Sequence, residues 1–312
     1  MDATLKRDLT GLPNRELEFI ITNVTAKKPK GLVTKTALIE KIGALTKEHP
    51  EVTDQVNNQV NHLIRNYKFA GRSSISWSIP ERTEKELSLT EEKLEELIQQ
   101  QAGTDVFEHE IKAPITSKPA LNRASWLEQN KLLLQFVYAG APYFEEIGYE
   151  LEEIQPTRRA NALIRLPDGS PVIECRANSK IVSALHGEVS SLLNTHTQVL
   201  AFSNGDIASI KNRLKAKKQS AKHKKLAGDF DTVDVKASRS VNDLDDSGTY
   251  QNLLGTDALQ RVRYTFSFKP TDGSDLDVTI YLNNKGNVWF VSEVPEEVID
   301  YVFSNIKEVK GL

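Results

Sequence analysis

The chain has 312 residues, of which 39% are hydrophobic and 27% charged, a composition that supports a folded core and excludes a disordered chain. Its 40 basic and 43 acidic side chains give a net charge of -3, which excludes a protein that coats nucleic acid by overall positive charge. Any nucleic-acid contact must therefore come from local basic patches. Because Cys175 is the single cysteine, an intramolecular disulfide is excluded and a cysteine-based zinc site is disfavoured.

The length predicts more than one domain, since a domain typically has about 100–200 residues. No apolar run approaches the roughly 18 residues that a membrane-spanning helix needs. The first residues also lack the apolar core of a signal peptide. We therefore expect a soluble, cytoplasmic protein that does not bind a membrane.

Residues 1–80 have the pattern of three helices followed by a hairpin. Apolar side chains recur at helical spacing in each expected helix, and Thr34 is a suitable N-cap for the second. Gly71 would form the turn of a hairpin over residues 69–80, where apolar side chains alternate. This order is typical of a winged helix-turn-helix. The expected helices cover about residues 14–22, 34–45 and 53–66.

The third expected helix would be the recognition helix of this domain. Opposite its apolar stripe it carries amides, a histidine and an arginine, side chains that can contact base edges and phosphates in a major groove. The alternative is a solvated polar face on a winged helix that binds protein. The candidate nucleic-acid-binding residues here are Gln55, Asn58, Gln59, His62 and Arg65.

Four further segments follow. Residues 81–124 are an expected connector, with one charged helix that begins at the capping box Ser88–Glu91 and ends near Gln101. Residues 125–227 form an α/β unit, residues 228–258 an acidic linker or loop, and residues 259–312 three strands and a helix. The expected class is α/β, or α+β over the whole chain. It comprises an N-terminal winged helix, a central mixed sheet flanked by helices, and C-terminal antiparallel strands with a helix.

Within residues 125–227 the pattern begins with a helix from Ser125 that Pro142 breaks, followed by a short helix to Ile147. A long basic helix from Asp206 ends it. Expected strands lie between them at about residues 151–154, 160–166, 172–176 and 198–202, with a helix at 180–193. The C-terminal segment adds strands near residues 262–268, 276–282 and 288–291 and a helix over 295–309.

The most informative motif spans three of these elements. Ile147-Gly148-Tyr149 precedes Arg159-Ala160-Asn161-Ala162-Leu163-Ile164, the next strand carries Ile173-Glu174-Cys175-Arg176-Ala177, and residues 199–205 close the pattern. In order and spacing this resembles the PD-(D/E)XK nuclease superfamily, and most closely the N-terminal nuclease region of type I restriction subunits. The resemblance covers about residues 125–210. It implies a restriction-endonuclease-like core.

In that superfamily, acidic groups on adjacent strands hold Mg²⁺ against the scissile phosphate, where the metal activates water. The resemblance implies Glu174 and Asn161 as metal ligands, with Arg176 as the third catalytic residue. Asn161 stands where the family has Asp, and Arg176 stands where it has Lys. Because Arg stays protonated, it can hold a phosphate but cannot act as a general base. The sequence thus leaves open an active Mg²⁺-dependent endonuclease or a weakened or inactive core without a cofactor.

Other side chains could compensate for these departures. Lys180 or Asp168 could act from nearby positions, and Glu128 or Glu146 could supply a carboxylate from a helix.

A run of basic side chains over residues 211–225 contains no acid. Like charges repel along a helix, so phosphates of a nucleic acid would stabilise it. A solvated charged face, a flexible linker, or pairing with the acidic segment after Gly228 are the alternatives. The candidate nucleic-acid-binding residues are Lys211, Arg213, Lys215, Lys217, Lys218, Lys222, Lys224 and Lys225.

The sequence supports three hypotheses. The first is a nucleic-acid-binding protein of a restriction or defence-like system, with duplex DNA as the expected partner. The second is a non-enzymatic transcriptional or chromosome-associated regulator that uses the degenerate core for interaction. The third is a protein-interaction subunit that does not touch nucleic acid. The oligomeric state and any protein partner stay open.

Overall fold

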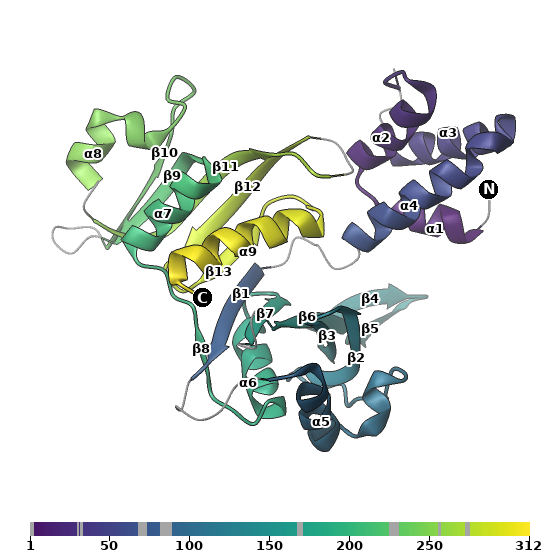
Figure 1. The fold of residues 1–312 in the computed structure, drawn as a ribbon, viewed down its shortest axis with the longest axis horizontal. Coiled ribbons are helices and arrows are strands. Elements are labelled where there is room, and N and C mark those ends of the chain that lie inside the picture. The colour runs from purple at the N-terminus through teal and green to yellow at the C-terminus, as the bar shows by residue number, and fades with distance from the viewer. Residues whose placement is uncertain are drawn as a thin grey trace. The chain divides into compact units, whose positions relative to one another are not determined.

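The computed structural model describes residues 3–29, 31, 34–67, 74–81, 89–166, 171–224, 231–254, 257–271 and 275–312. They form helices and antiparallel sheets, which is the α+β class. The chain divides into two compact units (Figure 1). Unit 1 contains residues 1–72, 203–282 and 290–312, and unit 2 contains residues 73–202 and 283–289.

Unit 1 begins with a helical bundle whose apolar stripes form a common core. The three helices expected in this region are confirmed, and the Thr34 hydroxyl caps the second of them by accepting a hydrogen bond from the backbone N–H of Ala37. A preceding helix was not expected from the sequence. The bundle consists of α1 (Ala3–Gly11), α2 (Asn14–Thr25), α3 (Lys35–Glu48) and α4 (Thr53–Tyr67), with a 3-10 turn η1 (Pro50–Val52).

The rest of unit 1 contains four neighbouring strands of an antiparallel sheet, with two helices on one face of them (Figure 1). Tyr264 donates a hydrogen bond to the carbonyl of Ile207 in α7, and Phe266 lies against Tyr301 of α9. The strand order is β10 (Thr232–Lys236), β9 (Lys217–Lys224), β11 (Ala258–Phe268) and β12 (Leu276–Asn283). The helices are α7 (Asn204–Leu214) and α9 (Glu296–Lys310), and η4 (Leu244–Asp246) and α8 (Gly248–Leu254) lie in the connection between β10 and β11.

The expected long basic helix from Asp206 is wrong beyond residue 214. α7 ends at Leu214, the following C-cap residue Lys215 has a left-handed φ of 50°, and the chain continues as β9. Ala221 and His223 of β9 are buried while Lys217 and Lys224 are exposed. This alternation was hidden because lysines occupy both faces of the strand. The expected linker over 228–258 likewise contains β10, η4 and α8.

Unit 2 contains antiparallel strands with α5 (Glu91–Ala102) and α6 (Val182–Leu192) packed on one face through a shared apolar core. The 3-10 turn η2 (Thr104–Phe107) follows α5. The strand order is β13 (Asn287–Phe290), β1 (Ser74–Pro80), β7 (Val172–Ala177), β6 (Thr157–Arg165), β3 (Lys131–Ala139) and β2 (Ala120–Glu128), and β8 (Thr197–Val199) also pairs with β1.

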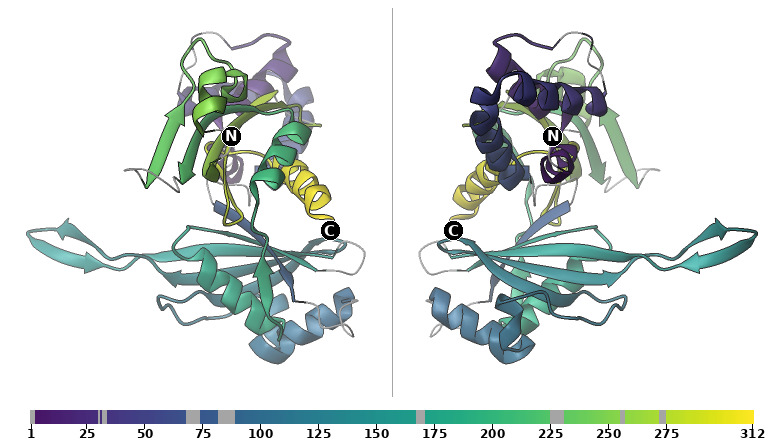
Figure 2. Two further views of the ribbon diagram at one scale, coloured as in Figure 1. Left: turned by 90° about the vertical axis from the view of Figure 1, so that its left-hand side faces the viewer. Right: turned by 90° about the vertical axis from the view of Figure 1, so that its right-hand side faces the viewer.

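A separate two-stranded ribbon, β4 (Tyr143–Ile147) with β5 (Glu150–Ile154), interrupts the connection between β3 and β6. Figure 2 shows it extending away from the unit 2 sheet. The expected short helix ending at Ile147 is therefore wrong. Within unit 2 the expected strands near 151–154, 160–166 and 172–176 and the helix near 180–193 are confirmed.

The expected helix from Ser125 is also wrong, because β2 and β3 occupy that segment. Leu132, Leu134 and Phe136 of β3 pack against the helices, while Leu133 is buried on the other face. A strand that is buried on both faces gives a continuous apolar run, which periodicity does not distinguish from a helix. The expected mixed sheet is wrong as well, since every pairing whose register is described is antiparallel.

The expected wing over residues 69–80 is wrong for its described part, residues 74–80. Ser74–Ser76 of β1 pairs with β13 on one side and with β7 on the other, so no edge is free for a hairpin partner. Gly71, the expected turn residue, lies outside the described residues. The alternation of Ile75, Trp77 and Ile79 therefore reflects an inner strand of unit 2.

Candidate functional site

Glu174, the proposed metal ligand, lies on β7 in a buried ion cluster. Its carboxylate accepts hydrogen bonds from Arg176 Nε, from Arg165 Nε at 3.0 Å and from Trp77 Nε1 at 3.2 Å. Arg165 Nη2 also lies 2.9 Å from Glu174 Oε2. Burial by itself would raise the pKa of Glu174, but the guanidinium groups of Arg176 and Arg165 lower it to about 2. The carboxylate is therefore ionised, and two arginines neutralise it.

Asn161 lies beside this cluster. It stands opposite Arg176 in the β6–β7 ladder, and directly opposed residues of an antiparallel pair point to the same face of a sheet. Its Oδ1 atom is buried and makes no hydrogen bond within the described part of the chain. The structure thus brings Asn161, Glu174 and Arg176 to one sheet face, as the strand pattern predicted.

This donor set does not fit Mg²⁺. The ion prefers an octahedron of oxygen ligands, whereas both oxygens of Glu174 accept from guanidinium groups and Asn161 adds only a neutral oxygen. Among the described residues, no three His, Cys, Asp or Glu side chains gather where they could hold a metal. Glu128 and Glu146 lie on β2 and β4 and not on helices, Lys180 is exposed, and Asp168 lies outside the described residues.

The polar face of α4 forms part of a small groove. Gln55, Asn58, Gln59 and His62 line a pocket of about 330 Å³ together with Phe19 and Asn23 of α2. Arg65 is exposed further along the same helix. Four of the five side chains proposed for base contact therefore line one surface.

The basic run over residues 211–225 divides into paired and exposed side chains. Lys211 Nζ lies 2.7 Å from Asp243 Oδ2 and 2.6 Å from Asp245 Oδ2, and Lys218 Nζ lies 2.5 Å from Asp245 Oδ1. Burial acts to lower the pKa of Lys211, but the two aspartates raise it overall. The acidic segment thus pairs with part of the run. Arg213 pairs with Glu308, Lys215 is exposed, and Lys225 lies outside the described residues.

The lysines of β9 that do not face the core lie on the side of the unit 1 sheet opposite α7 and α9. On this side Lys222 stands opposite Arg261, and Arg263 follows two residues later on β11. The guanidinium carbons of Arg261 and Arg263 lie 5.3 Å and 6.0 Å from the ring centroid of Tyr281 on β12. We call this surface the basic sheet face and define it as Lys217, Lys222, Lys224, Arg261, Arg263 and Tyr281.

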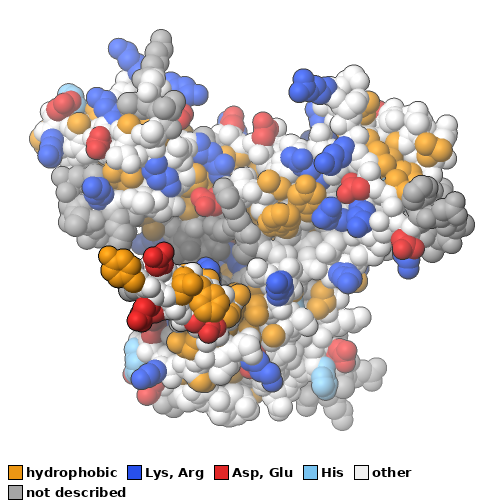
Figure 3. All heavy atoms as spheres, turned by 180° about the vertical axis from the view of Figure 1, so that it is seen from behind, with side chains coloured by type: hydrophobic (Ala, Val, Ile, Leu, Met, Phe, Trp, Pro, Cys, Tyr) orange, Lys and Arg blue, Asp and Glu red, His pale blue; other side chains and the backbone are white. Residues whose placement is uncertain are grey.

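Figure 3 views this side of the molecule and shows Lys and Arg side chains interspersed with hydrophobic ones over unit 1. Acidic groups are few here, although Asp234 Oδ2 lies 3.5 Å from Arg261 Nη2. Arg263 Nε is buried without a hydrogen-bond partner among the described residues. The contribution of β11 and β12 was missed from the sequence. The alternation Arg261-Val262-Arg263-Tyr264 could have indicated two arginines on one strand face.

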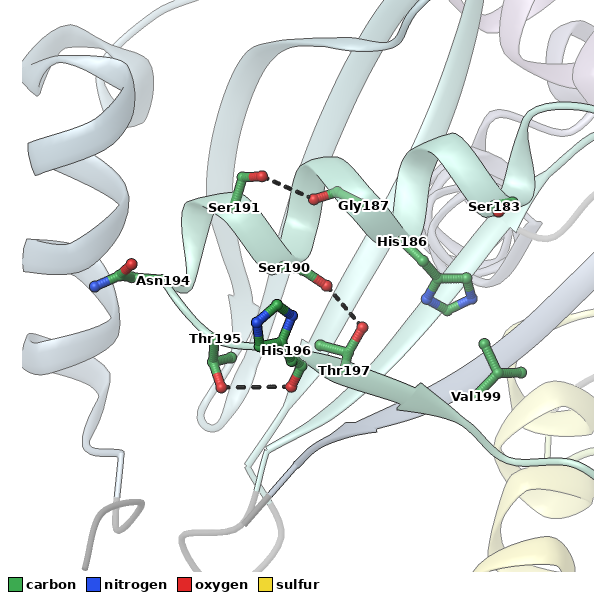
Figure 4. A pocket seen from close by; sticks show the side chains of 10 residues that line it. All are labelled: Ser183, His186, Gly187, Ser190, Ser191, Asn194, Thr195, His196, Thr197 and Val199. Carbon is green, nitrogen blue, oxygen red and sulfur yellow. Dashed lines mark hydrogen bonds between the residues drawn. The ribbon is translucent and has the colours of Figure 1, made fainter. Parts of the chain in front are cut away.

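A polar pocket of about 570 Å³ lies beside α6 and β8 in unit 2 (Figure 4). Its lining consists mainly of Ser, Thr, Asn and His residues and includes no Asp, Glu, Lys or Arg. The ring of His186 makes two hydrogen bonds, between Nε2 and Ser76 Oγ at 2.5 Å and between Nδ1 and Ser78 Oγ at 3.0 Å. Burial lowers the pKa of His186 to about 4. Because Ser76 and Ser78 are buried, a substrate has no access to the two serines that His186 contacts.

Comparisons with known proteins do not assign the chain to a family. No model of a known protein family matches the chain, and a search of curated proteins found no match. In the part of the chain that the structure describes, every helix is too short or too polar to cross a membrane.

Proposed function

We propose that the protein binds nucleic acid through the basic sheet face of unit 1. The observation that carries this proposal is the ring of Tyr281 flanked by Arg261 and Arg263 on a sheet face that no described helix is seen to cover. An aromatic ring on an open sheet can stack on a base, an interaction of about 1–3 kcal/mol per base. The neighbouring Lys222 and Lys224 can contact phosphates.

The polar groove of α4 is a second proposed contact, since its amides suit the edges of bases. The sheet face suits an extended single strand, whereas the α4 face suits the major groove of duplex DNA. Both forms of DNA are therefore needed as probes. The restriction or defence-like setting and the cytoplasmic location stay predictions from the sequence.

The test is fluorescence anisotropy with labelled single-stranded and duplex DNA at about 50 mM and about 200 mM salt. We expect binding that weakens with salt, and a roughly tenfold or greater loss in Tyr281→Ala because the stacking contact is removed. The double variant Arg261→Ala/Arg263→Ala should lose affinity and also show a smaller salt slope. Failure of the wild type to bind either probe at low salt would refute the proposal.

A charge-matched control is available in unit 2. Lys118 and Lys180 are exposed, and no ion pair is described for either. The variant Lys118→Ala/Lys180→Ala removes the same charge as the double arginine variant. It should bind DNA like the wild type, which separates a local surface from overall charge.

A further experiment distinguishes whether the Glu174 cluster is an active nuclease site or has no nuclease activity. Because two arginines engage the carboxylate, we propose that unit 2 is not a metal-dependent nuclease, which favours the non-enzymatic regulator. Plasmid incubated with Mg²⁺ or Mn²⁺ should stay supercoiled. Metal-dependent nicking that disappears in Glu174→Gln, while the protein stays folded, would restore the nuclease.

A further inference from the structure

The ribbon β4–β5 is strongly acidic and carries exposed aromatic side chains. We call residues Tyr143–Ile154 the acidic arm. They include no Lys or Arg, and their five glutamates form no ion pair with any described residue. The fractional exposure of the side chains is 68% for Phe144, 102% for Tyr149 and 73% for Leu151. The glutamates are Glu145, Glu146, Glu150, Glu152 and Glu153.

The base of the arm is well defined. The β3–β6 ladder continues to the pair Ala139 and Thr157, and Gly140 N then donates a hydrogen bond of 2.7 Å to the carbonyl of Pro156. A Cβ atom on Gly140 would lie 2.9 Å from Arg158 Cγ, so the two chains approach closely at this point. The arm therefore leaves the sheet as a continuation of β3 and β6 (Figure 2).

The isolated arm is unfavourable in two respects. Glu145 stands directly opposite Glu152, and like charges in that arrangement destabilise a strand pair. The register also places Phe144 and Leu151 on the same face of the ribbon, where both are exposed. A two-stranded ribbon without further packing is marginally stable in water. Glu146 and Glu153 share the face of Phe144 and Leu151. A basic surface that surrounds an apolar or aromatic group would therefore cover the apolar side chains and attract these glutamates.

The chain itself carries such a surface. The basic sheet face presents lysines and arginines around Tyr281. Phosphates are excluded as a partner of the arm, and pairing of two arms is disfavoured, because both would bring negative charges together. We propose that the acidic arm of one molecule docks on the basic sheet face of a second copy.

This contact joins two different surfaces, so it is head-to-tail and each molecule keeps one free arm and one free face. Copies can therefore add further into rings or chains. The arm uses the same face as the proposed nucleic-acid site, so the inference that DNA and the arm compete rests on the proposed function. Self-association by itself does not.

The test is sedimentation velocity of the full chain over a range of concentrations, without nucleic acid. We expect species larger than a monomer that dissociate as salt rises, since the contact is between opposite charges. The variant Glu145→Lys/Glu152→Lys removes most of the net negative charge of the arm, because two of its five glutamates become lysines, and it keeps the cross-strand repulsion, so it should weaken association roughly tenfold or more without changing folding. The face variant Arg261→Glu/Arg263→Glu should weaken it similarly.

Mixing an arm variant with the face variant gives the sharpest result, because each keeps the surface that the other has lost. The variant Glu145→Lys/Glu152→Lys does not suit this mixture, because its new lysines would attract the new glutamates of the face variant. The arm variant for mixing is therefore Phe144→Ser/Leu151→Ser, which introduces no charge, and its partner is Arg261→Glu/Arg263→Glu. We expect each alone to be monomeric and the mixture to form a one-to-one dimer, in which the intact face of the first would hold the intact arm of the second.

A wild type that is monomeric at all concentrations, association that the arm variants do not weaken, or a mixture that forms no dimer would each overturn the docking proposal. DNA binding separates the two proposals. A monomeric wild type that binds DNA overturns only docking, whereas self-association in a protein that binds no DNA overturns only the proposed function. With both in place, the arm variant should bind DNA at least as tightly as the wild type.

Discussion

Replacement of Glu174 by glutamine should strongly destabilise unit 2. The substitution keeps the size of the side chain but removes the negative charge between Arg165 and Arg176, whose side chains are 13% and 1% exposed. Removing one partner of a buried ion pair typically costs about 3–5 kcal/mol, because the remaining charge is buried without compensation. Here two guanidinium groups would face each other, so we expect a loss within that range.

The assay is urea unfolding at pH 7, followed by circular dichroism. With a slope of about 1–3 kcal/mol per molar urea, the midpoint of the unit 2 transition should fall by about 1–5 M. Glu153→Gln is the matched control, since Glu153 is exposed and makes no ion pair with a described residue. It should stay within about 0.5 kcal/mol of the wild type.

The pH dependence gives a second check. The pKa of Glu174 is lowered to about 2 from the usual 4.5, so the folded state favours the ionised carboxylate. Its contribution to stability is fully present above pH 4.5 and is lost as pH falls through 2. Glu174→Gln should lack this part of the acid-induced loss. A glutamine variant as stable as the wild type at pH 7 would refute the account of Glu174 as an ion-cluster residue.

Three other substitutions or conditions have expected outcomes. Gly286→Ala should destabilise the protein more than Gly311→Ala in urea unfolding: both have positive φ, but only at Gly286 would the new Cβ meet a backbone oxygen, at 2.1 Å. Equal losses would contradict the close approach. Lys211→Ala should cost about 1–3 kcal/mol because it removes the lysine that pairs with Asp243 and one of the two lysines that pair with Asp245, while the exposed Lys215→Ala should have little effect in the same assay. Because the pKa of His186 is lowered from 6.5 to about 4, folding favours the neutral ring, so thermal stability should fall as pH drops from 6.5 to 4. If the variant His186→Asn loses as much thermal stability as the wild type between pH 6.5 and 4, protonation of His186 does not cause the loss.

Helices and strands with one buried face could be predicted from the sequence. The stripes of α2, α3, α4 and α6 and the alternation in β11 and β12 follow from the need to bury one side of each element. Segments with two buried faces could not be predicted correctly from the sequence. β3 is apolar on both sides, and its pattern was taken for a helix.

Two other strands were misread because tertiary contacts override local pattern. Lys218 of β9 is buried against Asp245, so a lysine occupies a position that normally indicates solvent. β1 has the alternation of a hairpin strand, but its partners β7 and β13 are far away in the sequence. A strand pattern determines which side chains share a face, and it does not determine which strands become neighbours.

The same distinction holds at the candidate sites. The sequence by itself determined that Glu174 and Arg176 point to one side of β7, because side chains alternate with a period of two along a strand. Only the tertiary structure decided that Arg165 and Trp77 close on the Glu174 carboxylate. It alone also decided that Tyr281 lies beside the arginines of β11, since pairing between strands depends on contacts that no local pattern encodes.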